Sequence, residues 1–125
     1  MGFKLGNRSL PIANQGKLRK PMSFKIKRED LEPGVNAEAV DGETMIIDKD
    51  IPEGSKVFKK AVAHEAVHCR EMGSGQLAYG DDWVRDGNKT YARKDGKIKY
   101  NGKWHEEGSH VFPWEQRAVK AEKDV

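Results

Sequence analysis

The stretch from Lys56 to Met72 most constrains the fold, because it lacks proline and glycine and places His64 and His68 four residues apart. Apolar residues recur in it near helical spacing, at Phe58, Val62, Cys69 and Met72, which predicts a largely buried helix. Positions i and i+4 lie on one face of a helix, so the two imidazoles can share one metal ion. The alternative is a pair of core histidines bonded to backbone carbonyls.

The limits of this helix are predicted from its flanking residues. Asp50 can act as the N-cap, with Pro52 early in the first turn and Glu53 three residues after the cap, while Ser55 is an alternative cap. Gly73 is the expected stop signal.

Glu65 follows the first histidine directly, so the segment has the form HExxH. In this arrangement the glutamate can reach a metal-bound water and take its proton. A catalytic zinc needs a third protein ligand and one open position. The candidates for that ligand are His105, His110, Cys69, a nearby acid or an acid from a later helix.

Two of these alternatives are disfavoured by position. Metzincins continue the motif with a glycine and a further histidine, but this chain has Glu71 and Ser74 at those places. Cys69 follows His68 directly and points about 100° away around the helix, so a small buried thiol is the better interpretation.

A second helix is predicted to start at Phe112-Pro113, with Glu115 and Ala118 on one face and Ala121 extending it. A glutamate on an apolar inner face is costly unless it is paired or binds a metal. The alternative is a solvated acid of the first turn, favoured by the helix dipole.

HExxH followed by a helix with Glu-x-x-Ala resembles the gluzincin branch of the zincin metallopeptidases, and is similar to compact phage and bacterial versions with Pro-Trp-Glu at the second helix. The resemblance covers roughly residues 44 to 122. It implies that His64, His68 and Glu115 bind Zn²⁺ and that Glu65 is the general base. It also implies an α+β fold: a small zincin-like domain with the active-site helix packed on a short sheet, a ligand-bearing C-terminal helix and an inserted β-hairpin.

Other elements are expected around these helices. Thr44–Asp48 reads as a strand, either a core strand or an edge that receives substrate by strand addition. Thr90–Arg93 and Lys97–Tyr100 flank the turn Lys94-Asp95-Gly96, which predicts a hairpin, and Asn101-Gly102 predicts a second turn. The hairpin could line a cleft, contact nucleic acid or be a solvated ribbon with a lysine-guarded edge. The side chains that could donate a hydrogen bond to a developing oxyanion are His105, His110, Tyr79, Tyr91 and Tyr100, with His110 weakly favoured.

Charge divides the chain into a basic arm, residues 1–28, and a domain, residues 29–125. The arm has eight Lys and Arg residues and no acid, and since the whole chain has a formal net charge of +3, the domain carries −5. We interpret the arm either as a solvated extension or as a segment that docks on a protein partner, with nucleic acid a weaker alternative.

The 125 residues suffice for one compact domain, with no apolar run that could span a membrane and no signal-peptide core. A single cysteine excludes an internal disulfide, so a cytoplasmic location is expected, or a virion if a phage encodes the chain. The predicted function is zinc-dependent peptide hydrolysis. Its alternative is a non-catalytic structural or assembly protein of a phage particle. A DNA-associated protease of the SprT-like type is a third reading, disfavoured because its third ligand is typically histidine.

Overall fold

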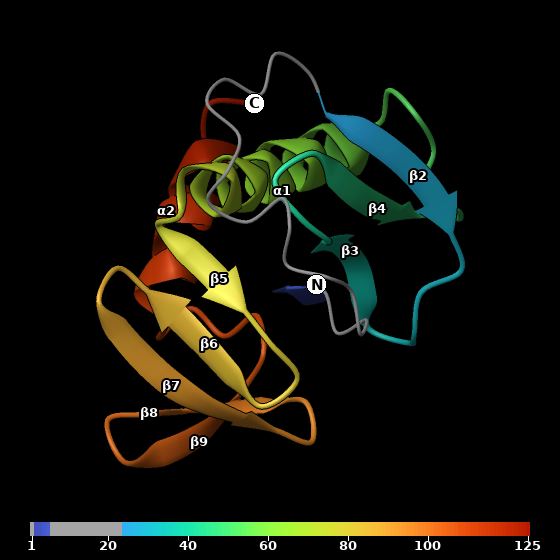
Figure 1. Ribbon diagram of the computed structural model, residues 1–125. Coiled ribbons are helices and arrows are strands. Elements are labelled where there is room, and N and C mark those ends of the chain that lie inside the picture. The colour runs from blue at the N-terminus through green and yellow to red at the C-terminus, as the bar shows by residue number, and fades with distance from the viewer. Residues whose placement is uncertain (1, 6–23) are drawn as a thin grey trace.

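The computed structural model describes residues 2–5 and 24–125, which form two sheets and two helices (Figure 1). The expected α+β class is confirmed. The elements in chain order are β1 (Gly2–Leu5), β2 (Lys25–Glu29), β3 (Val35–Ala39), β4 (Thr44–Asp48), α1 (Lys56–Ser74), β5 (Leu77–Tyr79), β6 (Trp83–Asp86), β7 (Lys89–Lys94), β8 (Lys97–Tyr100), β9 (Lys103–Glu106) and α2 (Pro113–Glu122). Neither of the two helices is long and apolar enough to cross a membrane.

The first sheet has the strand order β1-β3-β4-β2. β3 and β4 pair antiparallel, and β1 and β2 add to their outer sides in parallel. β4 is buried along Thr44, Met45, Ile46 and Ile47, as expected for a strand that is apolar on both faces. The predicted strand Thr44–Asp48 is therefore confirmed, but the alternative that it forms an exposed edge is wrong, because β2 and β3 flank it.

Both ends of the basic arm take part in this sheet, since β1 pairs with β3 and β2 pairs with β4. The predicted boundary after residue 28 falls inside β2, because backbone pairing and not lysine density determines where the fold begins. Arg28 shows this directly: its guanidinium donates to the Asp48 and Ile51 carbonyls and lies 5.0 Å from the centre of the Phe58 ring. Residues 6–23 of the arm lie outside the described part of the chain.

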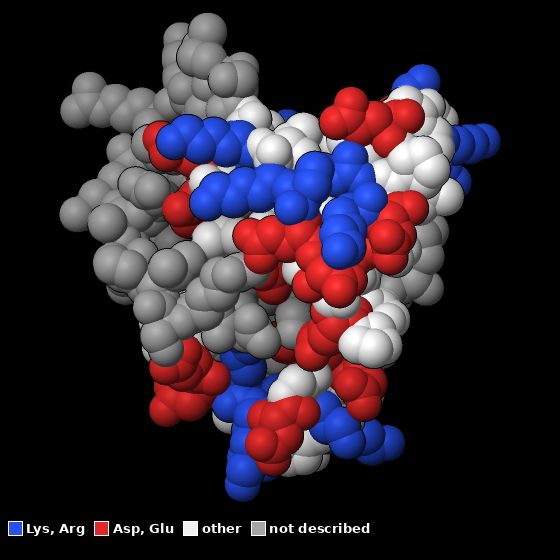
Figure 2. All heavy atoms as spheres, turned by 90° about the vertical axis from the view of Figure 1, so that its right-hand side faces the viewer, with Lys and Arg blue, Asp and Glu red and all other residues white. Residues whose placement is uncertain are grey.

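On the face of the molecule at the right of Figure 1, a band of basic side chains lies directly against acidic ones (Figure 2). Among the ion pairs of the described residues, Nη1 of Arg28 lies 3.7 Å from Oε1 of Glu53. The described residues on this face thus present both signs of charge rather than a uniformly basic surface.

α1 begins at the alternative cap and not at Asp50. The Ser55 hydroxyl accepts a hydrogen bond from the Phe58 amide at 3.1 Å, whereas residues 49–54 form turns. Gly73 remains helical and buried, so the predicted stop is also wrong. The last helical residue is Ser74, and the C-cap is Gly75, two residues after Gly73, whose φ of 88° lets its amide reach the Met72 carbonyl.

The second sheet is an antiparallel meander, β5 to β9 in sequence order. The predicted hairpin is confirmed: β7 and β8 are joined by Asp95-Gly96, with φ of 52° and 75°, and β8 and β9 by Asn101-Gly102, with φ of 52° and 80°. Two consecutive positive φ angles are the signature of the two-residue turn that Asp-Gly and Asn-Gly favour.

α1 packs on β3 and β4, and α2 packs along α1 (Figure 1). Arg117 of α2 reinforces this contact: it holds both carboxylate oxygens of Glu71 on α1, at 2.6 and 2.9 Å, and reaches Asp86 on β6 at 2.7 Å. One residue therefore ties both helices to the second sheet. The same contact brings the inner faces of α1 and α2 together at the histidines.

Candidate metal centre

His64 and His68 lie on the inner face of α1 and have no exposed surface. Their ring centres are 5.0 Å apart and the rings are inclined by 77°. They sit one helical turn apart, as their spacing predicts, so both imidazoles face the same partner helix.

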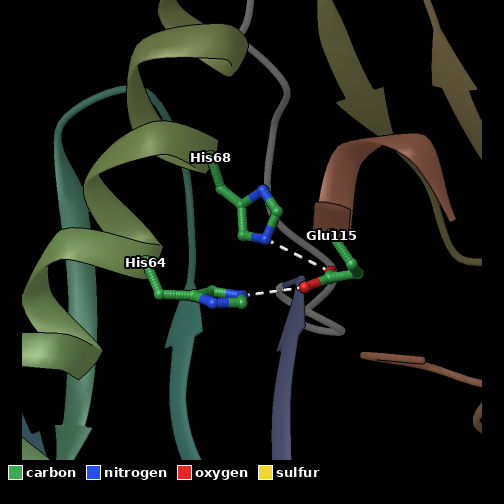
Figure 3. Close-up of side chains that lie close together, drawn as sticks. All are labelled: His64, His68 and Glu115. Carbon is green, nitrogen blue, oxygen red and sulfur yellow. Dashed lines mark hydrogen bonds and ion pairs between the residues drawn. The ribbon is translucent and has the colours of Figure 1, made fainter. Parts of the chain in front are cut away.

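That partner is Glu115 in the first turn of α2, which starts with Pro113 as predicted. Glu115 is 1% exposed and its carboxylate faces both histidines (Figure 3). Its Oε1 lies 2.8 Å from Nε2 of His64, and its Oε2 lies 3.2 Å from Nε2 of His68. His68 and Glu115, which are 47 positions apart in the sequence, thus meet in the fold. The alternative of a solvated acid is wrong because Glu115 is buried.

The three side chains could hold a metal ion, since each offers one ligand atom and these atoms lie within 4.8 Å of one another. Two ligands of a tetrahedral zinc, each at about 2.0–2.1 Å, are about 3.3 Å apart. The histidine nitrogens lie 2.8 and 3.2 Å from the two different oxygens of Glu115, which is close to that spacing.

Unsatisfied polar atoms support the same assignment. Both ring nitrogens of His68 and Oε2 of Glu115 are buried and make no well-aligned hydrogen bond among the described residues, and Nε2 of His68 and Oε2 of Glu115 meet only as an ion pair at 3.2 Å. An orphaned buried polar atom costs about 1–3 kcal/mol, and native proteins rarely leave several together. A cation at this point would give Nε2 of His68 and Oε2 of Glu115 a better-placed partner than their mutual contact does.

The electrostatics of the group are strongly coupled. Burial tends to lower the pKa of His64, but the hydrogen bonds and charges of Glu115 and Glu122 outweigh it and raise the value above 6.5. Burial likewise tends to raise the pKa of Glu115, but the charges and hydrogen bonds of His68 and His64 lower it to about 2. Glu115 is therefore a carboxylate at neutral pH, which is the form that binds metal.

Glu65 is fully buried next to this group, and neither of its carboxylate oxygens has a hydrogen-bond partner among the described residues. Burial raises its pKa well above the usual range, and the charges of Glu115, Glu38 and Glu122 add to the effect. A carboxylate with a raised pKa binds a proton more strongly than an exposed glutamate does.

The sequence prediction did not include Glu122, whose Oε2 lies 2.7 Å from Nδ1 of His64. A carboxylate on the outer nitrogen fixes a histidine ring and leaves Nε2 free for the metal. Glu122 comes seven residues after Glu115, which is close to two full turns of α2. This spacing is the feature of the sequence from which a role for Glu122 beside Glu115 could have been predicted.

The other predicted candidates lie elsewhere. Cys69 is buried with its sulfur 3.6 Å from the Thr44 carbonyl, and burial raises the pKa of its thiol, so the interpretation as an inert core residue stands. Tyr79 donates to the Val40 carbonyl and His110 is exposed. The rings of Tyr91, Tyr100 and His105 pack in an aromatic cluster with Phe112 and Trp114. The described contacts of these side chains do not identify an oxyanion donor.

Comparison with known proteins adds no identification: no family model, no curated protein and no solved structure matches the chain. The assignment of a candidate metal centre therefore depends on the donor set, its burial and its geometry.

Proposed function

We propose that this protein is a zinc-dependent peptidase in which His64, His68 and Glu115 hold the metal and Glu65 is the general base. The observation that carries the proposal is the placement of Glu65, a fully buried carboxylate without a hydrogen-bond partner among the described residues, beside a buried His-His-Glu group. A purely structural zinc site needs no such residue.

The donor set favours zinc over other ions. Two imidazoles and one carboxylate suit Zn²⁺, whereas Mg²⁺ and Ca²⁺ prefer oxygen ligands alone. Three protein ligands leave one coordination position for water or substrate, which is typical of catalytic sites. When bound, zinc would supply Lewis acidity and lower the pKa of a coordinated water to about 7.

Glu65 would accept the proton of the attacking water and pass it to the leaving amine of the peptide. Its raised pKa suits the first of these steps, because a carboxylate that binds a proton more strongly is a better acceptor for the proton of water. Glu122 would hold His64 in the orientation that keeps Nε2 toward the metal. The resemblance to gluzincins supports the same roles for His64, His68, Glu115 and Glu65.

The decisive experiment separates metal binding from catalysis. The purified protein is expected to contain close to one zinc per chain and to cleave members of a quenched-fluorescent peptide library. Glu65→Gln is expected to retain the zinc and lose at least about a hundredfold in hydrolysis, in the range of a lost general base. Glu106→Gln, the same change at a 78% exposed side chain, is the matched control.

Undiminished hydrolysis by Glu65→Gln would disprove the mechanism. Zinc bound at full occupancy without turnover of any peptide would instead favour the non-catalytic structural role.

A further inference from the structure

The last two strands of the second sheet carry exposed lysines and an exposed tryptophan. β8 and β9 lie at the end of this sheet farthest from α1 (Figure 1). Residues 94–106 contain four lysines, all of them exposed, against two acids, although residues 29–125 as a whole carry a net charge of −5. Trp104 is 44% exposed, whereas Trp114 is fully buried in the core. This end of the sheet thus differs from the rest of the domain in both charge and apolar exposure.

The strand register places these side chains on one face. Ile98 of β8 is buried, so its neighbours Lys97 and Lys99 lie on the opposite face of the sheet. Lys94 is the register partner of Lys97, and Trp104 is the register partner of Lys99, which puts both on the same face as these lysines. We call the surface made by Lys94, Lys97, Lys99 and Trp104 the basic face.

Two features of the basic face are unfavourable for the protein alone. Lys94 and Lys97 are register partners, and like charges directly opposite each other destabilise an antiparallel pair. Of the lysines on this face, Lys97 alone forms an ion pair within the described part of the chain, a 4.0 Å contact with the exposed Glu106. Beside them, Trp104 keeps much of its apolar ring in water. A ligand that combines negative charge with a flat ring would relieve both effects.

The same side chains line a depression. Lys94, Asp95, Lys97 and Trp104 surround an open cavity of about 330 Å³. This volume is near the lower end of the range of about 300–1,000 Å³ for small-molecule sites, so it suits a unit the size of one nucleotide. Lysine ammonium groups bind phosphate as point charges, and an indole ring can stack on any base. Asp95 repels phosphate, but it can accept a hydrogen bond from an N–H group on the pairing edge of a base.

We propose that the basic face is a binding site for single-stranded nucleic acid, with a base stacked on Trp104 and neighbouring phosphates held by Lys94 and Lys97. A single strand fits better than a duplex, because its bases can leave the stack and their pairing edges are free to reach Asp95. An acidic peptide fits less well, since it offers no regularly spaced rings for Trp104 and is repelled by Asp95 and Glu106. The site does not depend on the proposed peptidase function, because none of its residues belongs to the metal-binding group.

The direct test is the fluorescence anisotropy of labelled oligo-dT and oligo-rU strands of about 12 nucleotides, mixed with the metal-free full-length chain at about 50 mM salt. Both strands are expected to bind, because stacking and phosphate contacts do not require the 2′-hydroxyl. Trp104→Leu keeps an apolar side chain but removes the ring, and is expected to lose at least about tenfold in affinity. Trp104→Phe keeps a ring and should recover most of that loss. Binding of a duplex of the same length should not change in Trp104→Leu.

Salt dependence tests the lysines. The double variant Lys94→Ala, Lys97→Ala should reduce the slope of log affinity against log salt by about 1.4, because each phosphate contact to a single strand contributes about 0.7. Lys56→Ala, Lys59→Ala removes two exposed lysines of α1 and should leave the slope unchanged. The stability of the first variant should not fall, because it loses a like-charge pair. A loss of binding in this variant is therefore not a consequence of unfolding.

Absence of binding of both strands at about 100 μM protein would overturn the proposal, as would equal affinities of the unmodified chain and Trp104→Leu. Inorganic polyphosphate and polyglutamate of similar charge test the class of ligand. If either bound as tightly as the strands, the basic face would be a general site for polyanions and the proposal would be wrong. All these readouts use metal-free protein and no hydrolysis, so a failure of zinc binding or of catalysis is distinguishable from a failure of this site.

Discussion

Two polar clusters join α1 to α2, and they differ in whether the protein completes them by itself. In the first cluster, Arg117 makes paired hydrogen bonds with Glu71 and Asp86, and its charge balances theirs in part. In the second, the buried His64, His68 and Glu115 leave several atoms without hydrogen-bond partners among the described residues. The first cluster is complete without a ligand and the second is not.

This difference is the physical reason for which we propose a structural role for the first cluster and a metal-binding role for the second. The Arg117 side chain is 37% exposed, so its charged group and its partners can be solvated at modest cost when the contact opens. The polar groups of the second cluster cannot be solvated in this way, because its side chains are at most 1% exposed. We therefore expect substitutions in the first cluster to change stability and those in the second to change metal affinity.

The largest effect is expected for Glu115→Ala, which removes the only carboxylate of the proposed ligand set. Loss of a direct ligand should exceed the ten- to hundredfold loss typical of outer partners, so zinc affinity is expected to fall by more than about a hundredfold. Competition titration with a chromophoric chelator measures it. Gln116→Ala, at the adjacent exposed position, should retain full affinity, and similar affinities for both variants would remove Glu115 from the site.

The second expected effect tests the structural cluster. Arg117→Ala leaves Glu71 and Asp86 close together without their common cation, and a hydrogen bond to a charged group contributes about 1.5–3 kcal/mol. After allowance for the exposure of Arg117, we expect a loss of about 2 kcal/mol in the free energy of unfolding, measured with urea. Arg85→Ala, at an exposed position of β6, is the control.

Zinc affinity of the folded Arg117→Ala protein should change by less than about tenfold, because the residue contacts none of the proposed ligands. A larger loss of affinity with unchanged stability would reverse the distinction between the two clusters.

The sequence predicted those parts of the two clusters and their surroundings that depend on residues close together in the chain. The His64 and His68 face, the first turn of α2 with Glu115, and the Asp95-Gly96 and Asn101-Gly102 turns all follow from spacings within a few residues. Local rules of helix periodicity, capping and turn conformation suffice for such features.

Local rules failed where competing signals or distant partners decided the outcome. Asp50 and Ser55 both suit the N-cap position of α1. Because residues 49–54 are not helical, the N-cap is Ser55. Arg117 meets Glu71 across 46 positions and Asp86 across 31, and the pairing of β1 with β3 leaves no mark in composition. The charge-based boundary at residue 28 missed β2 for the same reason, because strand pairing depends on the partner.

Glu122 offers a smaller test of the functional cluster. Glu122→Gln keeps a polar group near Nδ1 of His64 but removes the charge that supports the ring. At pH 8.5, zinc affinity should fall about tenfold, the low end of the range for outer partners of metal-bound histidine. Stability of the metal-free protein at that pH should change little. Asp124→Asn, two residues further on at an exposed position, is the matched control. An unchanged affinity would show that Glu122 does not support the site.

The smallest effect concerns pH and sharpens the interpretation of Glu122. The pKa of His64 is raised above 6.5, because Glu115 and Glu122 outweigh the opposing effect of burial. Zinc requires the neutral ring, so affinity should fall by less than about tenfold per pH unit as the pH is lowered through that raised pKa. The metal-free protein should show the opposite trend. Its stabilisation by protonated His64 is complete below the unfolded pKa and is lost as pH rises through the folded value.

Zinc should therefore raise the melting temperature more at pH 8.5 than at pH 6.5. Glu122→Gln removes one of the charges that raise the pKa of His64, so its affinity profile should shift to lower pH. The difference in zinc affinity between Glu122→Gln and the unmodified chain should then narrow as the pH falls. The variant lacks the carboxylate that supports the His64 ring, but protons also compete less strongly with zinc for that ring. Zinc titrations of both proteins from pH 6 to 8.5 test this, and a gap that widens at low pH would show that Glu122 does not act through His64.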